Sequence, residues 1–252
     1  MKIRRQTIVL SIVFLVSLAA FVALFIVWPR IKRIHPKCRL YGGLTDELKD
    51  SSLYEDMQSG QSFCFVGDSI TSGLVTDGIP WYEPLVPYIR GDISNISVAG
   101  YTVIEMINSK NEIPYADIYV IAIGVNDVTI LKPDMSAATS DEYIDRIDQL
   151  SEILWDISPD AKLYFIAPWP YITDDEVING RHDQFCGVLE DWCSRSDAIY
   201  LDPTATILSV MDEEGISKFT QDGLHPNAPE GLGLYSYAVL KADHDRQTND
   251  AG

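Results

Sequence analysis

Four short stretches of the sequence bring together residue types that can attack a carbonyl carbon. They supply one serine, one glycine, one asparagine and one aspartate–histidine pair. The stretches are Gly67-Asp68-Ser69-Ile70, Ser97-Val98-Ala99-Gly100, Gly124-Val125-Asn126-Asp127 and Asp222-Gly223-Leu224-His225-Pro226. Each type is common in loops, but the combination and its order predict a single reactive site.

Ser69, His225 and Asp222 have the chemistry of a nucleophile, its base and the group that orients the base. A serine hydroxyl is a poor nucleophile until a base takes its proton, and a histidine can do so near neutral pH. Asp222 lies three residues before His225. Its carboxylate can therefore accept a hydrogen bond from the second ring nitrogen and fix the tautomer.

A carbonyl under attack develops a negative charge on its oxygen, and this charge needs hydrogen-bond donors that are already in place. The candidate donors of this oxyanion hole are the main-chain N–H groups of Ser69 and Gly100 and the side-chain amide of Asn126. A glycine at position 100 allows the main chain to approach a ligand closely.

The elements that precede these residues must position them. Short apolar runs, typical of strands buried on both faces, occur at residues 63–66, 93–98, 118–123, 163–167 and 198–201. Residues 141–157 and 174–195 have the apolar spacing of helices. This alternation predicts a doubly wound α/β fold with a mostly parallel five-stranded sheet, whose carboxyl edge carries the site.

The N-terminal region has a different composition. Residues 8–28 contain no charged side chain, and about 20 apolar helical residues span a bilayer, so we expect one uncleaved transmembrane helix. The expected organisation is a cytoplasmic stub with the anchor over residues 1–29, a basic stalk and lead-in over 30–59, a folded domain over 60–243 and a flexible tail over 244–252. Positive charges flank the anchor almost equally and leave its orientation open.

The distribution of charge along the chain limits the classes of molecule that it can bind. Residues 1–39 hold eight of the 19 Lys and Arg residues and no acid, so the rest of the chain has 11 basic against 37 acidic residues. Such an acidic body is unsuited to nucleic acid, which basic groups bind by neutralising phosphates, and to anionic lipid headgroups. We therefore expect no nucleic-acid partner, while the oligomeric state is left open.

The four cysteines do not predict a disulfide framework. Cys186 and Cys193 are seven residues apart in a predicted helix, which separates their Cα atoms by about 10 Å, beyond disulfide reach. His182 shares a helical face with both, so a zinc site is conceivable, but packing of a buried helix explains the same spacing. We expect no metal.

The four stretches together resemble the motifs of the SGNH hydrolases, also called the GDSL esterase/lipase superfamily, over about residues 60–240. The Gly67–Ile70 stretch is similar to the nucleophile block, with Ile70 where the family often has leucine. The other blocks are matched in order by the stretches around Gly100, Asn126 and Asp222–His225. The resemblance implies a flavodoxin-like three-layer α/β/α fold, ester hydrolysis through an acyl-serine intermediate and no cofactor.

A membrane-anchored member of this family resembles enzymes that act on acetyl groups of cell-surface glycans. This resemblance implies a small acylated molecule or glycan as substrate and a single-pass membrane protein with an extracytoplasmic catalytic domain. Asp68, Trp81 and Trp169 are the candidate substrate contacts. The two tryptophans are candidates because aromatic rings at strand ends can stack on sugars, and packing in the core or at its rim is the alternative for both.

Two other functions remain compatible with the sequence. An O-acyltransferase would use the same three residues but exclude water from the acyl-enzyme. A catalytically silent glycan-binding module is disfavoured because Ser69 and His225 are both present. A metal-dependent deacetylase is disfavoured because no histidine-rich ligand set accompanies Asp222 and His225.

Overall fold

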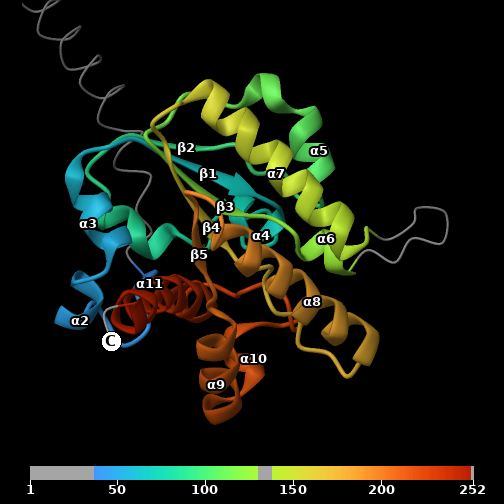
Figure 1. Cartoon of the computed structure of the whole chain (residues 1–252). Helices are drawn as coiled ribbons and strands as arrows, with labels where there is room; N and C mark the ends of the chain where they lie inside the picture. Colours follow the sequence, from blue (N-terminus) through green and yellow to red (C-terminus); the bar gives the residue numbers. More distant parts are fainter. Residues whose placement is uncertain (1–36, 130–137, 251–252) are drawn as a thin grey trace, which may run out of the picture. The chain divides into compact units, whose positions relative to one another are not determined.

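The computed structural model describes residues 37–129 and 138–250, which are built around a parallel five-stranded sheet (Figure 1). Its strands follow the order β2-β1-β3-β4-β5, and every neighbouring pair is parallel. The strands are β1 (Phe63–Gly67), β2 (Ile93–Asn95), β3 (Ile118–Ala122), β4 (Lys162–Ile166) and β5 (Ile199–Leu201). The predicted doubly wound sheet is therefore confirmed.

The register aligns the starts of the three strands that precede the reactive stretches. Phe63 of β1 lies opposite Ile93 of β2 and Ile118 of β3. Strand β2 is shorter than predicted, but the chain keeps following β1, because Val98 N–H donates to the carbonyl of Gly67. The three carboxyl ends consequently lie side by side.

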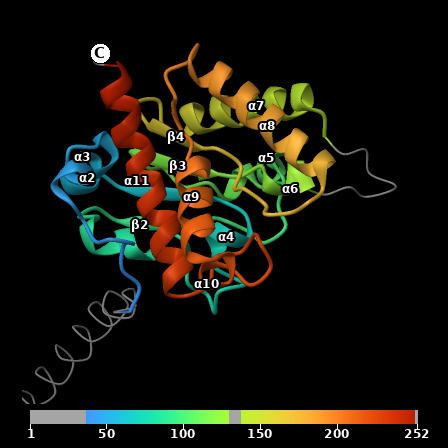
Figure 2. The same ribbon diagram turned by 90° about the horizontal axis from the view of Figure 1, so that it is seen from below.

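Alternating side chains of the strands point into two separate apolar layers, as the pleat requires. Phe63 and Phe65 of β1 belong to one layer, and Cys64 and Val66 belong to the other. Helices cover both faces of the sheet (Figures 1 and 2), which gives the predicted three-layer α/β/α architecture.

The first face packs against helices from both ends of the described chain. They are α2 (Asp46–Lys49), α3 (Ser52–Ser59), η1 (Glu83–Tyr88), α9 (Thr204–Glu214), α10 (Ile216–Phe219) and α11 (Glu230–Asp250). The second face packs against α5 (Val103–Asn108), α6 (Val125–Thr129), α7 (Ser140–Ile157) and α8 (Glu176–Cys193).

Helices α7 and α8 confirm the two helices predicted from apolar spacing. A capping box opens α7, where the Thr139 hydroxyl accepts from the Glu142 N–H and the Glu142 carboxylate accepts from the Thr139 N–H. Asp175 caps α8 in a similar way by accepting from the N–H groups of Val177 and Ile178.

Two domain boundaries predicted from composition are wrong. The folded unit begins at Lys37, and α3 buries Leu53 and Met57 in the core, so residues 37–59 belong to the domain rather than to a stalk. The expected flexible tail from residue 244 is helical, because α11 continues to Asp250. The polar composition of residues 244–250 does not predict a helix. Contacts of Asp243 with α3 hold this end of α11 in place.

Across residues 37–129 and 138–250, no helix has both the length and the apolarity needed to cross a bilayer. The predicted transmembrane segment, residues 8–28, lies outside the described residues.

Asp243 is the polar anchor between α11 and α3. Its side chain is fully buried and accepts hydrogen bonds from the Leu53 N–H, the Ser52 hydroxyl and the Arg246 guanidinium. We predict that Asp243→Ala lowers the free energy of unfolding by about 2–4 kcal/mol, because it leaves a buried N–H group without its acceptor. Urea denaturation measures the loss.

Asp245→Ala is the matched control for Asp243→Ala. This carboxylate is half-exposed and pairs with Lys241 on the surface of the same helix, so its removal should cost about 0–1 kcal/mol. Equal losses in the two variants would contradict the anchoring role of Asp243.

Candidate active site

Ser69 lies at the tight turn between β1 and the short helix α4 (Ser69–Ser72). Gly67 ends the strand, and a Cβ atom there would lie 2.4 Å from the Thr71 hydroxyl oxygen and 2.6 Å from the carbonyl oxygen of Ala122. Only glycine fits this close approach of β1, β3 and α4. The Asp68 carboxylate then caps α4 by accepting from the Ile70 N–H at 3.0 Å, and this fixes the backbone of Ser69.

Ser69, His225 and Asp222 form one hydrogen-bonded chain. Ser69 Oγ lies 2.9 Å from His225 Nε2, and His225 Nδ1 lies 2.6 Å from Asp222 Oδ2. An ionised carboxylate only accepts hydrogen bonds, so Nδ1 carries the ring proton and Nε2 presents its lone pair to the serine hydroxyl. This is the tautomer in which His225 can take a proton from Ser69.

Hydrogen bonds keep Asp222 ionised. Burial alone would raise its pKa, but the bond from the His225 ring and the N–H groups of Leu224 and His225 outweigh burial and lower the pKa to about 2. The Thr220 hydroxyl also donates to this carboxylate, at 3.1 Å. The negative charge of Asp222 is consequently present throughout the physiological pH range.

The loop that carries Asp222 and His225 is attached to the core at several points. Gly223 adopts a φ of +80°, and a Cβ atom there would lie 2.7 Å from the carbonyl oxygen of Ile172. The Tyr235 hydroxyl of α11 donates to the carbonyl of Leu224 at 2.9 Å. The geometry of His225 therefore depends on a tyrosine that the sequence analysis did not single out.

The two further candidate oxyanion donors are brought together. Gly100 has a φ of +81° and follows the segment that runs alongside β1. The Asn126 amide lies on α6, directly after β3, and donates to the carbonyl of Tyr101 at 2.9 Å. One amide hydrogen thus fixes the Gly100 loop, and the second remains available for an oxyanion.

The candidate substrate contacts Asp68, Trp81 and Trp169 are 0–1% exposed, so they do not contact substrate. For the two tryptophans, the alternative of packing in the core is the one observed. The indole rings of Trp81 and Trp169 contact each other with centroids 5.3 Å apart, and Trp169 also packs against Tyr235 at 4.9 Å. The tryptophans thus support the tyrosine that holds the His225 loop. Tyr171, two residues beyond Trp169, is the partly exposed aromatic residue of that segment.

Two buried carboxyl groups lie beneath the site. Burial is the main cause that raises the pKa of Asp68 to about 7, and the nearby Asp127 adds to it. Burial likewise raises the pKa of Asp127 to about 6, against the lowering effect of Arg146. Asp127 accepts from the Val103 N–H at 3.1 Å, so it holds the start of α5 while Asn126 holds Tyr101.

Arg181 on α8 is a further residue that the sequence analysis missed. Its guanidinium donates to three main-chain carbonyls, those of Asp127, Val128 and Ala138. It therefore fixes the end of α6, the helix that carries Asn126. No local pattern marks an arginine whose partners lie about 50 residues away in the sequence.

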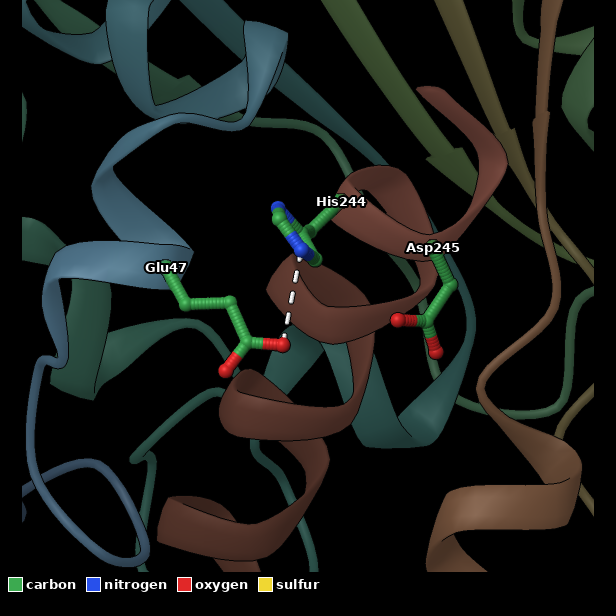
Figure 3. A group of neighbouring side chains, drawn as sticks. All are labelled: Glu47, His244 and Asp245. Atoms are coloured by element: carbon green, nitrogen blue, oxygen red, sulfur yellow. Dashed lines mark ion pairs between the residues drawn. The ribbon is translucent and has the colours of Figure 1, made fainter. Parts of the chain in front are cut away.

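The conceivable zinc set of His182, Cys186 and Cys193 does not assemble. The Cys186 sulfur contacts the His182 ring at 3.6 Å, while Cys193 is buried separately in the layer beneath α8. Within the described part of the chain, the group of three possible metal ligands is Glu47, His244 and Asp245 (Figure 3).

Two contacts explain the Glu47–His244–Asp245 group, one between α2 and α11 and one within α11. His244 Nε2 lies 3.4 Å from the Glu47 carboxylate, and the Lys241 ammonium contacts both oxygens of Asp245 at 2.9 Å. A lysine therefore already neutralises Asp245, and Glu47 is exposed.

The raised pKa of Asp68 predicts a pH-dependent stability. An unfolded aspartate has a pKa of about 3.9, so between pH 4 and 7 the folded state keeps a proton that the unfolded state releases, and stability falls as pH rises. An asparagine at position 68 cannot ionise, so Asp68→Asn removes this pH-dependent loss of stability, and its amide oxygen can still cap α4. We expect the variant to gain stability over the wild type, by up to about 3 kcal/mol at pH 8.

The measurement is urea denaturation of both proteins from pH 4 to 8. Asp160→Asn, at an exposed position, is the control and should leave the pH dependence unchanged. Parallel curves for Asp68→Asn and the wild type would show that the folded protein holds Asp68 ionised.

Comparison with known proteins identifies structures of similar fold. A GDSL-like lipase from Parabacteroides merdae has 17% sequence identity and a TM-score of 0.65, covering 74% of this chain and 97% of that one. Axe2, an acetylxylan esterase from Geobacillus stearothermophilus, has 20% identity and a TM-score of 0.63, with 74% and 95% covered. At these identities the likeness shows a shared fold.

LAE5, an alpha/beta hydrolase enzyme from the metagenome of Lake Arreo in Spain, has 19% identity and a TM-score of 0.60, covering 73% of this chain and 95% of that one. No curated protein sequence matches the chain. Residues 65–229, more than half of the chain, match the GDSL-like lipase/acylhydrolase family. The chain therefore belongs to this family, within the SGNH hydrolases, and is an enzyme that hydrolyses carboxylic esters.

Proposed function

We propose that this enzyme removes a small acyl group, an acetyl group, from a carbohydrate through an acyl-serine intermediate. The observation that carries the proposal is the chain of hydrogen bonds from Ser69 Oγ to His225 Nε2 at 2.9 Å and from His225 Nδ1 to Asp222 at 2.6 Å. It supplies a nucleophile, a general base and an ionised partner for the base in one line.

The first half of the reaction forms the acyl-enzyme. Ser69 Oγ bonds to the carbonyl carbon as its proton moves to His225 Nε2, and Asp222 stabilises the imidazolium that results. The bond from carbon to the alkoxy oxygen then breaks, and His225 gives the proton to the leaving alcohol. The acyl group remains on Ser69.

The second half restores the enzyme. A water molecule gives a proton to His225 Nε2 and bonds to the acyl carbon, the bond to Ser69 Oγ breaks, and the proton returns to Ser69. In both halves the carbonyl oxygen carries negative charge, for which we assign the N–H groups of Ser69 and Gly100 and the Asn126 amide as donors.

Two observations favour an acetylated carbohydrate as the substrate. Axe2, which has a similar fold over 95% of its own length, is an acetylxylan esterase. The pocket that borders His225 is also lined largely by polar side chains, which suits an alcohol rich in hydroxyl groups. We further propose that residues 8–28 anchor the enzyme in the membrane with its catalytic domain outside the cytoplasm, where cell-surface glycans are found.

The direct test compares acetate release from acetylated xylo-oligosaccharides by the purified wild type and by Ser69→Ala. We expect turnover by the wild type and a loss of at least about 10³-fold in the variant, because the nucleophile is gone. Matching circular dichroism spectra serve as the folding control. Release by Ser69→Ala at the wild-type rate would overturn the mechanism, and acetyl transfer to added glycan in excess of acetate release would identify a transferase.

Asn126→Ala tests the oxyanion assignment. Removing one oxyanion donor lowers kcat by about 10²–10³-fold in comparable enzymes, and we expect a loss of this size with little change in KM. Steady-state kinetics with 4-nitrophenyl acetate separates the two constants. A loss of less than tenfold in kcat, or an effect confined to KM, would remove Asn126 from this role.

A further inference from the structure

A pocket of about 310 Å³ borders His225, between its loop and the segment that follows the nucleophile helix. His225 and Asp222 form one wall, and Val75, Thr76 and Asp77 form another. During acyl transfer the leaving alcohol must lie within reach of His225 Nε2, because that atom supplies its proton. A pocket that shares the His225 wall is therefore placed to hold the alcohol part of the ester.

The walls of this pocket are polar and acidic. Gln221 and Asn227 bring side-chain amides, Asp77 and Asp222 bring carboxylates, and among the residues that the structure describes no lysine or arginine belongs to its lining. Amides and carboxylates form hydrogen bonds with hydroxyl groups, whereas two carboxylates repel an anion. The volume is at the lower end of the range for small-molecule sites, which suits one sugar ring.

Hydrogen bonds within residues 73–79 hold this wall in place, because the N–H groups of Thr76 and Gly78 both donate to the carbonyl of Gly73. Gly73 has a φ of +72°, and a Cβ atom there would lie 2.4 Å from the carbonyl carbon of Ile79. The buried Thr76 hydroxyl donates to the carbonyl of Pro226 at 3.2 Å, so the wall is tied to the residue after His225. Asp77 has a φ of +54° and is itself exposed at the turn, so its carboxylate is presented to solvent and ligand.

Building on the proposed esterase function, we propose that this pocket is the subsite for the leaving alcohol and that it selects a neutral sugar ring over an anionic one. Asp77 and Gln221 are the specificity-determining residues. Asp77 excludes a carboxylate on the sugar, and Gln221 binds its hydroxyl groups.

The test uses two substrates that differ in one charge, methyl 2-O-acetyl-glucopyranoside and the corresponding glucuronide, with the full-length enzyme. We expect kcat/KM for the glucoside to exceed that for the glucuronide by at least about tenfold. Asp77→Asn keeps the shape of the side chain and removes its charge. It should therefore raise kcat/KM for the glucuronide, so that the ratio of kcat/KM for the glucoside to that for the glucuronide falls about threefold to tenfold.

Gln221→Ala should lower kcat/KM for the glucoside about threefold to tenfold. We expect a smaller loss with 4-nitrophenyl acetate, because that leaving group has no sugar hydroxyls, and equal losses with the two substrates would contradict a role of Gln221 in binding the sugar. Asp212→Asn removes a charge from an exposed position outside the pocket and should leave the substrate ratio unchanged.

The outcomes separate the two proposals. If the wild type hydrolyses 4-nitrophenyl acetate through Ser69 but Asp77→Asn leaves the substrate ratio unchanged, the subsite is overturned and the esterase mechanism stands. The subsite is likewise overturned, and the esterase mechanism stands, if the wild type hydrolyses 4-nitrophenyl acetate and not the acetylated glucoside. If the wild type hydrolyses none of the esters, the proposed function fails and the subsite fails with it.

Discussion

The pairing of β1 with β2 on one side and β3 on the other is the constraint on which the site depends. Because all three strands are parallel, their carboxyl ends meet at one edge. Ser69 follows β1, Gly100 follows the segment that extends β2, and Asn126 follows β3. The chain reverses its direction of winding at this point, and the resulting crevice is where doubly wound proteins bind ligands.

The remaining residues reach this edge through contacts that are distant in the sequence. Asp222 and His225 lie on a loop that is held from below by Tyr235 and from the side by Thr76. Tyr235 in turn packs on Trp169, which packs on Trp81. Through these contacts the packed aromatic residues of the core hold the loop, and with it His225, in position.

Three aspartates of the site differ because their surroundings differ. Hydrogen bonds lower the pKa of Asp222 to about 2, while burial raises that of Asp68 to about 7 and that of Asp127 to about 6. Asp222 therefore carries a negative charge beside the ring of His225, which becomes an imidazolium during the reaction. Beneath the nucleophile, burial favours the neutral form of Asp68. Environment, rather than residue type, sets each role.

The sheet and the motif positions were predictable because both are local. Apolar runs mark the strands, and the residues that follow them mark the site. The sequence left open whether Trp81 and Trp169 contact substrate or pack in the core, since their packing involves Tyr235 from a helix far along the chain. The helical end of α11 was also missed, because the anchor at Asp243 involves partners near residue 52. Single-sequence patterns contain no information about such distant partners.

An organophosphonate that mimics the tetrahedral intermediate tests whether Ser69 is the activated nucleophile. We expect one phosphonyl group per chain, located on Ser69 by peptide mass spectrometry, with labelling that is lost in Ser69→Ala and strongly slowed in His225→Ala. Labelling of another residue, or undiminished labelling of Ser69→Ala, would contradict this role of Ser69.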